Sequence, residues 1–298
     1  MSSAFLPAAF DAFLAPARRS PALWRTALGF GLVIGVYVGL NLAAFGALAL
    51  IWGFNEAAEQ ASHLSDPATP VRALALLATF VPMALAPMIT VRVLHRRRPG
   101  TLFGPARRTA GDFFQSAAVL FGIQALLIAL SGAATETLPN LSVEHWMWLL
   151  PVTLVAVAGQ TLSEELVFRG YLQQQLAVRF ASRVIWMGLP SLLFASLHYS
   201  PGTLGQSATF AVFAAFLFGL AAADLTARTG SIGAAWGVHF ANNFFAIAIF
   251  ASEGTITGLA LRIAPEADPQ VSAFHPSALM ELLPLALSWL ILRRWLRR

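Results

Sequence analysis

The sequence predicts an all-α, polytopic membrane protein with about eight transmembrane helices and both termini in the cytoplasm. Three observations support this: a composition poor in charge, eight long apolar segments, and an alternating distribution of arginine. The 298 residues are 57% hydrophobic and 11% charged, whereas a soluble domain carries about 25% charged residues. Such a chain cannot cover the surface of a soluble fold. Disorder is also excluded, because it requires low hydrophobicity and high charge.

Eight apolar segments approach the ~20 residues that a helix needs to cross a bilayer. They are residues 27–54, 73–91, 113–131, 151–180, 184–198, 208–223, 231–252 and 277–292. The first is long enough to tilt or to extend past the bilayer. The fourth contains charged residues, and the fifth is short and carries Pro190, which we expect to kink it. The sequence therefore predicts eight spans, two of which are irregular.

Arginine marks one side of the predicted membrane. All 19 basic residues are arginine, and 16 of them fall before the first span, after the last span or in alternate loops. These are Arg18, Arg19, Arg25, Arg92, Arg96, Arg97, Arg98, Arg107, Arg108, Arg179, Arg183, Arg228, Arg293, Arg294, Arg297 and Arg298. The opposite side holds Arg72, Arg262 and eight acids: Glu56, Glu59, Asp66, Glu136, Glu144, Glu253, Glu266 and Asp268. By the positive-inside rule both termini are cytoplasmic, and the basic net charge reflects membrane orientation rather than nucleic-acid binding.

We expect no cleavable signal peptide in the amino-terminal segment, residues 1–26. Its first 20 residues lack a continuous apolar core before a small-residue cleavage site. An interfacial amphipathic helix and an unstructured tail are equally good interpretations. The chain has no cysteine, so it has neither disulfides nor thiolate chemistry.

Three charged residues lie close together inside the fourth apolar segment: Glu164, Glu165 and Arg169. Each charge inside a membrane segment costs about 2.5–3.5 kcal/mol on insertion scales and by default marks function. Glu165 and Arg169 are four residues apart and can pair on one helix face, whereas Glu164 lies about 100° away without a local cation. It suits a general base or acid. The alternative, that the helix follows the interface and all three residues are solvated, has about equal weight for such a pair taken alone.

Two histidines strengthen the functional interpretation. His198 ends the fifth apolar segment, one turn after Phe194, and His239 lies within the seventh. A lone intramembrane histidine is more often a hydrogen-bonded packing residue, but two on separate helices beside a glutamate pair favour a site. Asn243 shares a helix face with His239. Asn242 points elsewhere, and we expect it to make hydrogen bonds between helices.

These side chains indicate hydrolysis. Glutamate and histidine can activate a water molecule, directly or through a metal ion. A second histidine and an amide can donate hydrogen bonds to a developing oxyanion. The chain has no G-x-S-x-G elbow and no H-E-x-x-H zinc motif. Carboxylate and imidazole are acceptable zinc ligands, so a divalent metal is permitted but not required.

The three motifs resemble those of the CPBP intramembrane proteases. They are Glu-Glu-x-x-x-Arg at 164–169, Phe-x-x-x-His at 194–198 and His-x-x-x-Asn at 239–243. That family includes the type II CAAX prenyl endopeptidases and bacterial bacteriocin-processing or self-immunity proteins, often called Abi. The resemblance covers roughly residues 145–252. Each motif is weak alone, but the three in this order on apolar segments are specific.

The resemblance implies a role for each motif residue. Glu164 corresponds to the glutamate that activates water, with His198 as its partner, and Glu165 and Arg169 correspond to a pair that supports it. His239 and Asn243 correspond to the groups that stabilise the oxyanion. The family has been described both as glutamate-dependent and as metal-dependent. In the metal-dependent description, Glu164, His198 and His239 would ligate zinc.

The resemblance also divides the chain. Residues 1–26 form a cytoplasmic or interfacial segment, 27–144 accessory helices, 145–252 the catalytic core, and 253–298 an outer loop with the last helix. One geometric tension remains in the core. At 1.5 Å per residue, His198 lies about 21 Å from the start of its helix at Val184. Glu164 lies about 20 Å from Pro151, where its own helix starts at the opposite face of the membrane. In a hydrocarbon core about 30 Å thick, the depths of the two residues differ by about 10 Å. A working site requires Glu164 within about 8 Å of His198 or His239, since one water must bridge them.

We therefore expect a membrane-embedded endopeptidase that cleaves near the cytoplasmic side, in a bacterial inner membrane. Its partners would be the lipid bilayer and a peptide or membrane-associated protein, and not nucleic acid. Two alternatives stay open. A catalytically silent scaffold or immunity protein would keep its phenotype in Glu164→Ala and His239→Ala variants. A proton-coupled transporter, which also uses buried charges, would show uptake that depends on a proton gradient. The sequence leaves open the oligomeric state and the substrate's prenylation.

Overall fold

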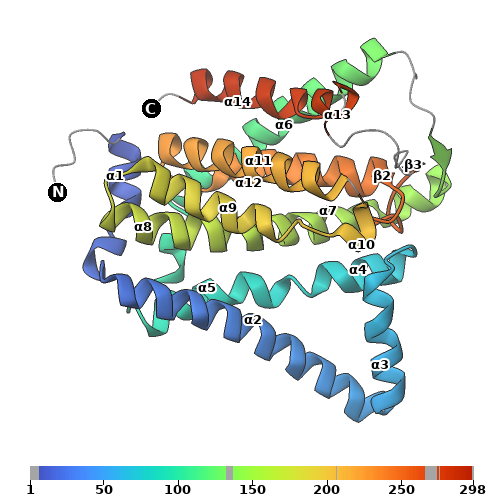
Figure 1. Cartoon of the computed structure of the whole chain (residues 1–298), viewed down its shortest axis with the longest axis horizontal. Helices are drawn as coiled ribbons and strands as arrows, with labels where there is room; N and C mark the ends of the chain where they lie inside the picture. The colour runs from blue at the N-terminus through green and yellow to red at the C-terminus, as the bar shows by residue number, and fades with distance from the viewer. Residues whose placement is uncertain (1–6, 132–136, 206, 266–273, 275, 297–298) are drawn as a thin grey trace.

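The computed structural model describes residues 7–131, 137–205, 207–265, 274 and 276–296. They form a bundle of long helices with a small sheet at one end (Figure 1). The helices of the first half are α1 (Ala8–Leu14), α2 (Leu23–Trp52), α3 (Phe54–Ser62), α4 (Pro70–Ala78), α5 (Val81–Val93) and α6 (Ala106–Ser131). Those of the second half are α7 (Val143–Glu165), α8 (Gln174–Arg179), α9 (Leu189–Ser196), α10 (Pro201–Leu204), α11 (Ser207–Thr229), α12 (Gly233–Phe244), α13 (Pro276–Met280) and α14 (Leu283–Trp295).

Three π-helical segments interrupt or extend these helices, and three short 3₁₀ turns join others. The π segments are η4 (Leu166–Gln173), η5 (Val184–Gly188) and η6 (Phe245–Ile249). The 3₁₀ turns are η1 (Ala17–Arg19), η2 (His63–Ser65) and η3 (Pro99–Leu102). Through η4, helices α7 and α8 form one continuous apolar helix from Val143 to Arg179. The expected kink at Pro190 corresponds to the change from the π turn η5 to α9, in whose first turn Pro190 lies.

Within the described residues, five helices are long and apolar enough to cross a membrane. They are Leu23–Trp52, Pro70–Val93, Ala106–Leu130, Val143–Arg179 and Ser207–Thr229. Leu50, Trp148 and Val155 are among many large apolar side chains on the outer surface of the bundle, as expected for helices that contact lipid. The chain is thus an integral membrane protein, as predicted.

The other three predicted spans are not reproduced as long helices. The segment 184–198 forms a shorter apolar helix, Val184–Ser196. The segment 231–252 is divided among α12, η6 and a strand, and 277–292 is divided between α13 and α14. Hydropathy recognises apolar runs but does not detect the helix breaks inside them, so the five candidates do not confirm the count of eight.

The described chain is mostly helical, as predicted, and a small sheet adds to the helices. Its strands are β1 (Leu138–Pro139), β2 (Phe250–Ser252) and β3 (Arg262–Ala264). The central strand β3 pairs antiparallel with β1 and parallel with β2. Strands this short carry no alternating pattern that sequence could reveal. The sheet joins the segments before α7 and after η6 at one end of the bundle (Figure 1).

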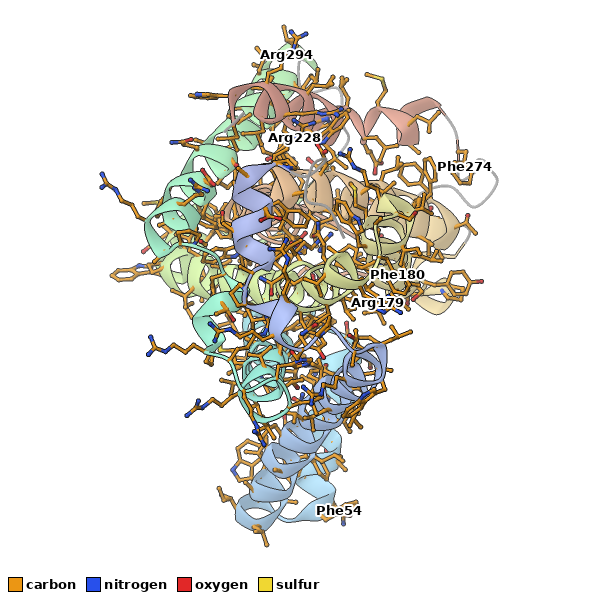
Figure 2. The ribbon with its side chains drawn as sticks, turned by 90° about the vertical axis from the view of Figure 1, so that its left-hand side faces the viewer. Phe54, Arg179, Phe180, Arg228, Phe274 and Arg294 are labelled. Atoms are coloured by element: carbon orange, nitrogen blue, oxygen red, sulfur yellow. The ribbon has the colours of Figure 1, made fainter. Side chains whose placement is uncertain are left out.

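The arginine-rich segments meet at the opposite end, where Figure 1 places both ends of the chain. There Arg108 donates to the Thr229 carbonyl at 3.0 Å, and Arg293 approaches Asp224 to 3.5 Å. Figure 2 looks onto this end and labels Arg179, Arg228 and Arg294 on α8, α11 and α14. Five charged residues used for the topology lie outside the described residues: Glu136, Glu266, Asp268, Arg297 and Arg298.

The amino-terminal segment packs on the protein at this end. Helix α1 contacts α8 and α11, and the ring centroid of Phe10 lies 5.3 Å from that of Trp186. The described part, from Pro7 onward, is therefore a docked helix rather than a loose tail.

A buried polar network connects the amino-terminal segment to the long helix. The Nδ1 atom of His95 lies 2.8 Å from the hydroxyl of Ser20 and 3.1 Å from Nε2 of Gln175, and its Nε2 lies 3.0 Å from the hydroxyl of Tyr171. Arg97 donates to Gln174 at 2.6 Å. The network holds the long helix immediately after Arg169.

Candidate active site

The long helix carries the three charged residues at its change from α to π geometry. Glu164 and Glu165 are the last residues of α7, and Arg169 lies in η4. A π segment shifts the side chains that follow it, and such segments are frequent at functional sites. All three side chains are buried, so the interpretation of a solvated, interfacial glutamate pair is wrong.

The buried cluster consists of Arg169, Glu165, His239 and Glu164, in this order of contact. Nη1 of Arg169 donates to Oε1 of Glu165 at 2.9 Å, which is the predicted pair. The same Oε1 atom lies 2.8 Å from Nδ1 of His239. Nε2 of His239 in turn lies 3.2 Å from Oε2 of Glu164. Glu164 therefore has an imidazole partner, supplied by α12 and not by its own helix.

Aromatic rings enclose the cluster. The guanidinium carbon of Arg169 lies 5.0 Å from the ring centroid of Phe194 and 5.5 Å from that of Phe218, within the range of cation–π attraction. The Phe218 ring lies 4.7 Å from the imidazole of His239. These apolar walls keep bulk water from the charges, which strengthens the interactions between them.

Arg169 is also anchored to α11. Its Nη2 atom donates to the Gly219 carbonyl at 3.4 Å, and one turn later Gln173 donates to the Ala223 carbonyl at 2.9 Å. Helix α11 lies so close to α9 here that a Cβ atom on Gly219 would be 2.7 Å from Cβ of Ser191. Glycine at 219 thus permits the close approach that places Phe194 and Phe218 beside Arg169.

His198 stands on the other side of Phe194. Its Nδ1 atom lies 2.9 Å from the Phe194 carbonyl, and because a carbonyl only accepts, Nδ1 carries the proton. The free Nε2 atom of neutral His198 is then an acceptor. The Phe194 ring lies 4.6 Å from the His198 ring and 5.8 Å from the His239 ring. One ring thus contacts both histidines.

Asn243 lies one turn beyond His239 and donates to Oε1 of Gln160 at 3.0 Å. Gln160 is one turn before Glu164 on α7, so the amide pair fixes α12 against the glutamate helix. Asn242 differs from the expectation of a hydrogen bond between helices. Its side chain is exposed and donates to Oδ1 of Asn243, on the same helix, at 3.2 Å.

A cavity of about 1180 Å³ reaches this cluster. Its lining includes His198, His239 and Asn243 from the predicted site, together with Asn242. Glu164 and Glu165 contact His239 and are not themselves among the lining residues. Such a volume exceeds a typical small-molecule pocket and can hold several residues of a peptide.

The predicted zinc ligands do not fit a metal site in this arrangement. Among the residues that the structure describes, no three carboxylate or imidazole groups gather so that they could hold a metal ion. Glu164 and His239 instead face each other at 3.2 Å. We therefore derive no step through a metal.

Three contributors were not predicted: Gln160, Phe218 and Gly219. Gln160 lies one turn before Glu164 in the same polar run, so helical spacing could have identified it. Phe218 and Gly219 sit in an ordinary apolar helix, and nothing in the sequence distinguishes them from packing residues.

Comparisons with known proteins agree with the resemblance stated from the motifs. Residues 146–245 match the sequence profile of the family described as "Type II CAAX prenyl endopeptidase Rce1-like", close to the expected 145–252. A curated relative, "Uncharacterized protein YyaK" of Bacillus subtilis (strain 168), is 24% identical over 261 residues, which span 83% of this chain and 85% of the relative. No solved structure matches the chain. Over residues 146–245 the chain is thus similar to the Rce1-like type II CAAX prenyl endopeptidases, a family of membrane peptidases, and all six predicted site residues lie in the matched segment.

Proposed function

We propose that the protein is an intramembrane endopeptidase that hydrolyses a peptide bond at the inner end of the cavity. The observation that carries the proposal is the buried contact series from Arg169 through Glu165 and His239 to Glu164. Charged side chains inside a membrane protein carry a large free-energy cost, so a cluster of them marks a functional site.

The charge balance of the cluster supplies one mobile proton. Arg169 and Glu165 carry opposite charges and neutralise each other. One proton shared between Glu164 and His239 then makes the four groups neutral together, which avoids the cost of an uncompensated buried charge. Glu165 accepts from Nδ1 of His239, so the shared proton belongs to the side of the ring that faces Glu164.

Glu164 acts as the general base. It takes a proton from a water molecule, and the water oxygen forms a bond to the carbonyl carbon of the substrate. His198 presents an acceptor nitrogen to the same cavity and orients that water. When the tetrahedral intermediate collapses, the carbon–nitrogen bond breaks and the leaving nitrogen receives the proton that Glu164 removed from water.

His239 and Asn243 stabilise the oxyanion. With the shared proton on Nε2, the imidazole donates at both nitrogens, Nδ1 to Glu165 and Nε2 to Glu164. Once Glu164 has taken up the proton from water, the Nε2 N–H turns to the developing negative charge. Asn243 uses one N–H on Gln160 and has a second for the oxyanion. Donors held in fixed positions before the reaction are worth several kcal/mol in the transition state.

The test is turnover of a pooled library of internally quenched peptides by purified protein in liposomes. We expect Glu164→Gln to lower turnover by about 10²- to 10⁴-fold, the range for a lost general base. Glu144→Gln is the matched control, because Glu144 lies on the same helix but is exposed at its far end. Full turnover in Glu164→Gln would overturn the proposal. Absence of cleavage by wild type, with the cellular phenotype retained in Glu164→Gln, would favour the silent scaffold.

A further inference from the structure

The cavity belongs to the sheet end of the bundle. On α11 its lining runs from Phe210 to Phe218, in the amino-terminal half of the helix, and on α6 from Gln124 to Ile128, in the carboxyl-terminal half. Both halves point toward the end that carries β2 and β3 (Figure 1). The cavity therefore extends from the sheet end inward to the histidines.

The sheet end is the arginine-poor end. The segments rich in arginine meet at the other end of the bundle, around α8 and the carboxyl-terminal ends of α11 and α14 (Figure 2). Arginine-rich loops stay in the cytoplasm, so the cavity faces the outer side. This differs from the expectation of cleavage near the cytoplasmic side, which considered the motifs without knowing where the cavity opens.

One face of the sheet forms part of the cavity wall. Phe250 and Ser252 of β2, and Arg262 and Ala264 of β3, all line the cavity. Residues two apart on a strand share a face, so the sheet directs these side chains inward and the backbone fixes their positions. Arg262 is thereby held in the wall rather than on a loose loop.

The guanidinium of Arg262 is oriented by Thr137. Its Nε atom donates to the Thr137 hydroxyl and its Nη2 atom to the Thr137 carbonyl, each at 2.6 Å. Nη1 has no hydrogen-bond partner among the described residues, and Arg262 is the sole arginine in the lining that they form. Glu281 lies in the same lining, on the segment between α13 and α14.

Building on the proposed peptidase function, we infer that the cavity takes a peptide from the outer side of the membrane and that Arg262 binds a carboxylate of this peptide. The carboxylate comes from a chain end or from an acidic side chain. A guanidinium with a fixed orientation pairs well with either. The apolar remainder of the wall, which includes Phe210, Phe218 and Phe250, accommodates apolar substrate residues between Arg262 and the catalytic groups.

The side of entry is tested by labelling, without any activity measurement. The chain has no cysteine, so Ser252→Cys introduces one thiol at the cavity wall and Arg107→Cys one at the arginine-rich end. We expect a membrane-impermeant maleimide to label Ser252→Cys in intact spheroplasts and Arg107→Cys only after permeabilisation. The reverse pattern would overturn entry from the outer side and leave the peptidase proposal untouched.

The role of Arg262 is tested by binding in a Glu164→Gln background, where cleavage is suppressed. The probes are three fluorescein-labelled alanine–leucine octapeptides: one with a free carboxyl terminus, one amidated, and one amidated with an internal glutamate. Arg262→Gln should weaken binding of at least one acidic peptide about tenfold and leave the amidated neutral peptide unchanged. The acidic peptide affected identifies the source of the carboxylate.

Arg72→Gln is the matched control. Arg72 lies at the start of α4, pairs with Asp66 at 3.1 Å and is absent from the cavity lining. It changes the net charge of the protein equally and should not alter binding. Equal affinities of all three peptides for the Arg262→Gln and parent proteins would overturn the assignment, even if both cleave peptides when Glu164 is restored.

Discussion

Nδ1 of His239 lies 2.8 Å from Oε1 of Glu165, the same oxygen that accepts from Arg169. Glu165 thus fixes the direction of the imidazole and, with it, the nitrogen that faces Glu164. We expect Glu165→Gln, which nearly preserves shape, to lower kcat far more than it changes KM, since the positioning of His239 matters chiefly in the transition state. Turnover of the peptide library measures this. Equal kcat in variant and wild type would show that Glu165 only supports the fold.

Arg169 compensates a buried carboxylate, so its removal should be costly. Both side chains of the pair are almost fully buried, at 2% and 0% exposure. Breaking such a pair by removing one partner costs about 3–5 kcal/mol. We therefore expect Arg169→Met to unfold at clearly lower denaturant concentration in detergent, and the double variant Arg169→Met/Glu165→Met to regain part of the loss. Absence of this recovery would contradict the pairing as the cause.

Gly219 permits the close packing of α11 on α9. A Cβ atom at this position would lie 2.7 Å from Cβ and 2.9 Å from Cα of Ser191, so Gly219→Ala must move one helix. We expect a loss of about 1–3 kcal/mol, seen as a lower midpoint in thermal unfolding. Gly122→Ala in α6 is the control, because an added Cβ there meets nothing within 4 Å. A helix interior gains up to about 1 kcal/mol from that change.

His95, at the arginine-rich end of the bundle, makes the free energy of unfolding depend on pH. Burial, and then the positive charges of Arg97 and Arg25, lower the pKa of His95 from 6.5 to about 4. The unfolded chain therefore binds a proton below pH 6.5 that the folded protein refuses until about pH 4, so stability falls as pH is lowered through this window. His95→Gln should flatten the decrease. Thermal unfolding between pH 7 and 4 measures it, and parallel curves for variant and wild type would contradict the prediction.

Chelation should leave turnover unchanged. Glu164 and His239 pair with each other, so they have little freedom to ligate zinc together with His198. Dialysis against a chelator, followed by metal analysis of the purified protein, tests this. Loss of turnover that stoichiometric zinc restores would contradict the metal-free mechanism.

The sequence predicted the site residues best where a residue carries a large free-energy cost in the membrane. Charges within an apolar segment are expensive, so Glu164, Glu165 and Arg169 stood out, and helical spacing predicted that Glu165 and Arg169 pair. The contact between Glu164 and His239 could not be predicted from the sequence, because it depends on how α12 packs against α7. Distances along single helices suggested a mismatch in depth between Glu164 and His198. The requirement for a histidine within about 8 Å of Glu164 is met by His239, at 3.2 Å.

Other features could not be read because their signals are local or absent. The π segments use the same residue types as α-helices, so hydropathy gave 151–180 and 231–252 as single uninterrupted spans. The strand around Arg262 is three residues long and showed in sequence only as part of an outer loop. The position of the cavity depends on both, so the sequence did not indicate toward which end of the bundle the cavity extends.

The polar network around His95 has a consequence for handling the protein. Ser20, His95 and Tyr171 form a buried series of contacts that ends two residues from Arg169. A truncation that removes the first twenty residues would take away one end of this series without touching the catalytic groups. An inactive product of a gene shortened in this way would reflect the loss of a structural contact rather than the loss of a catalytic group.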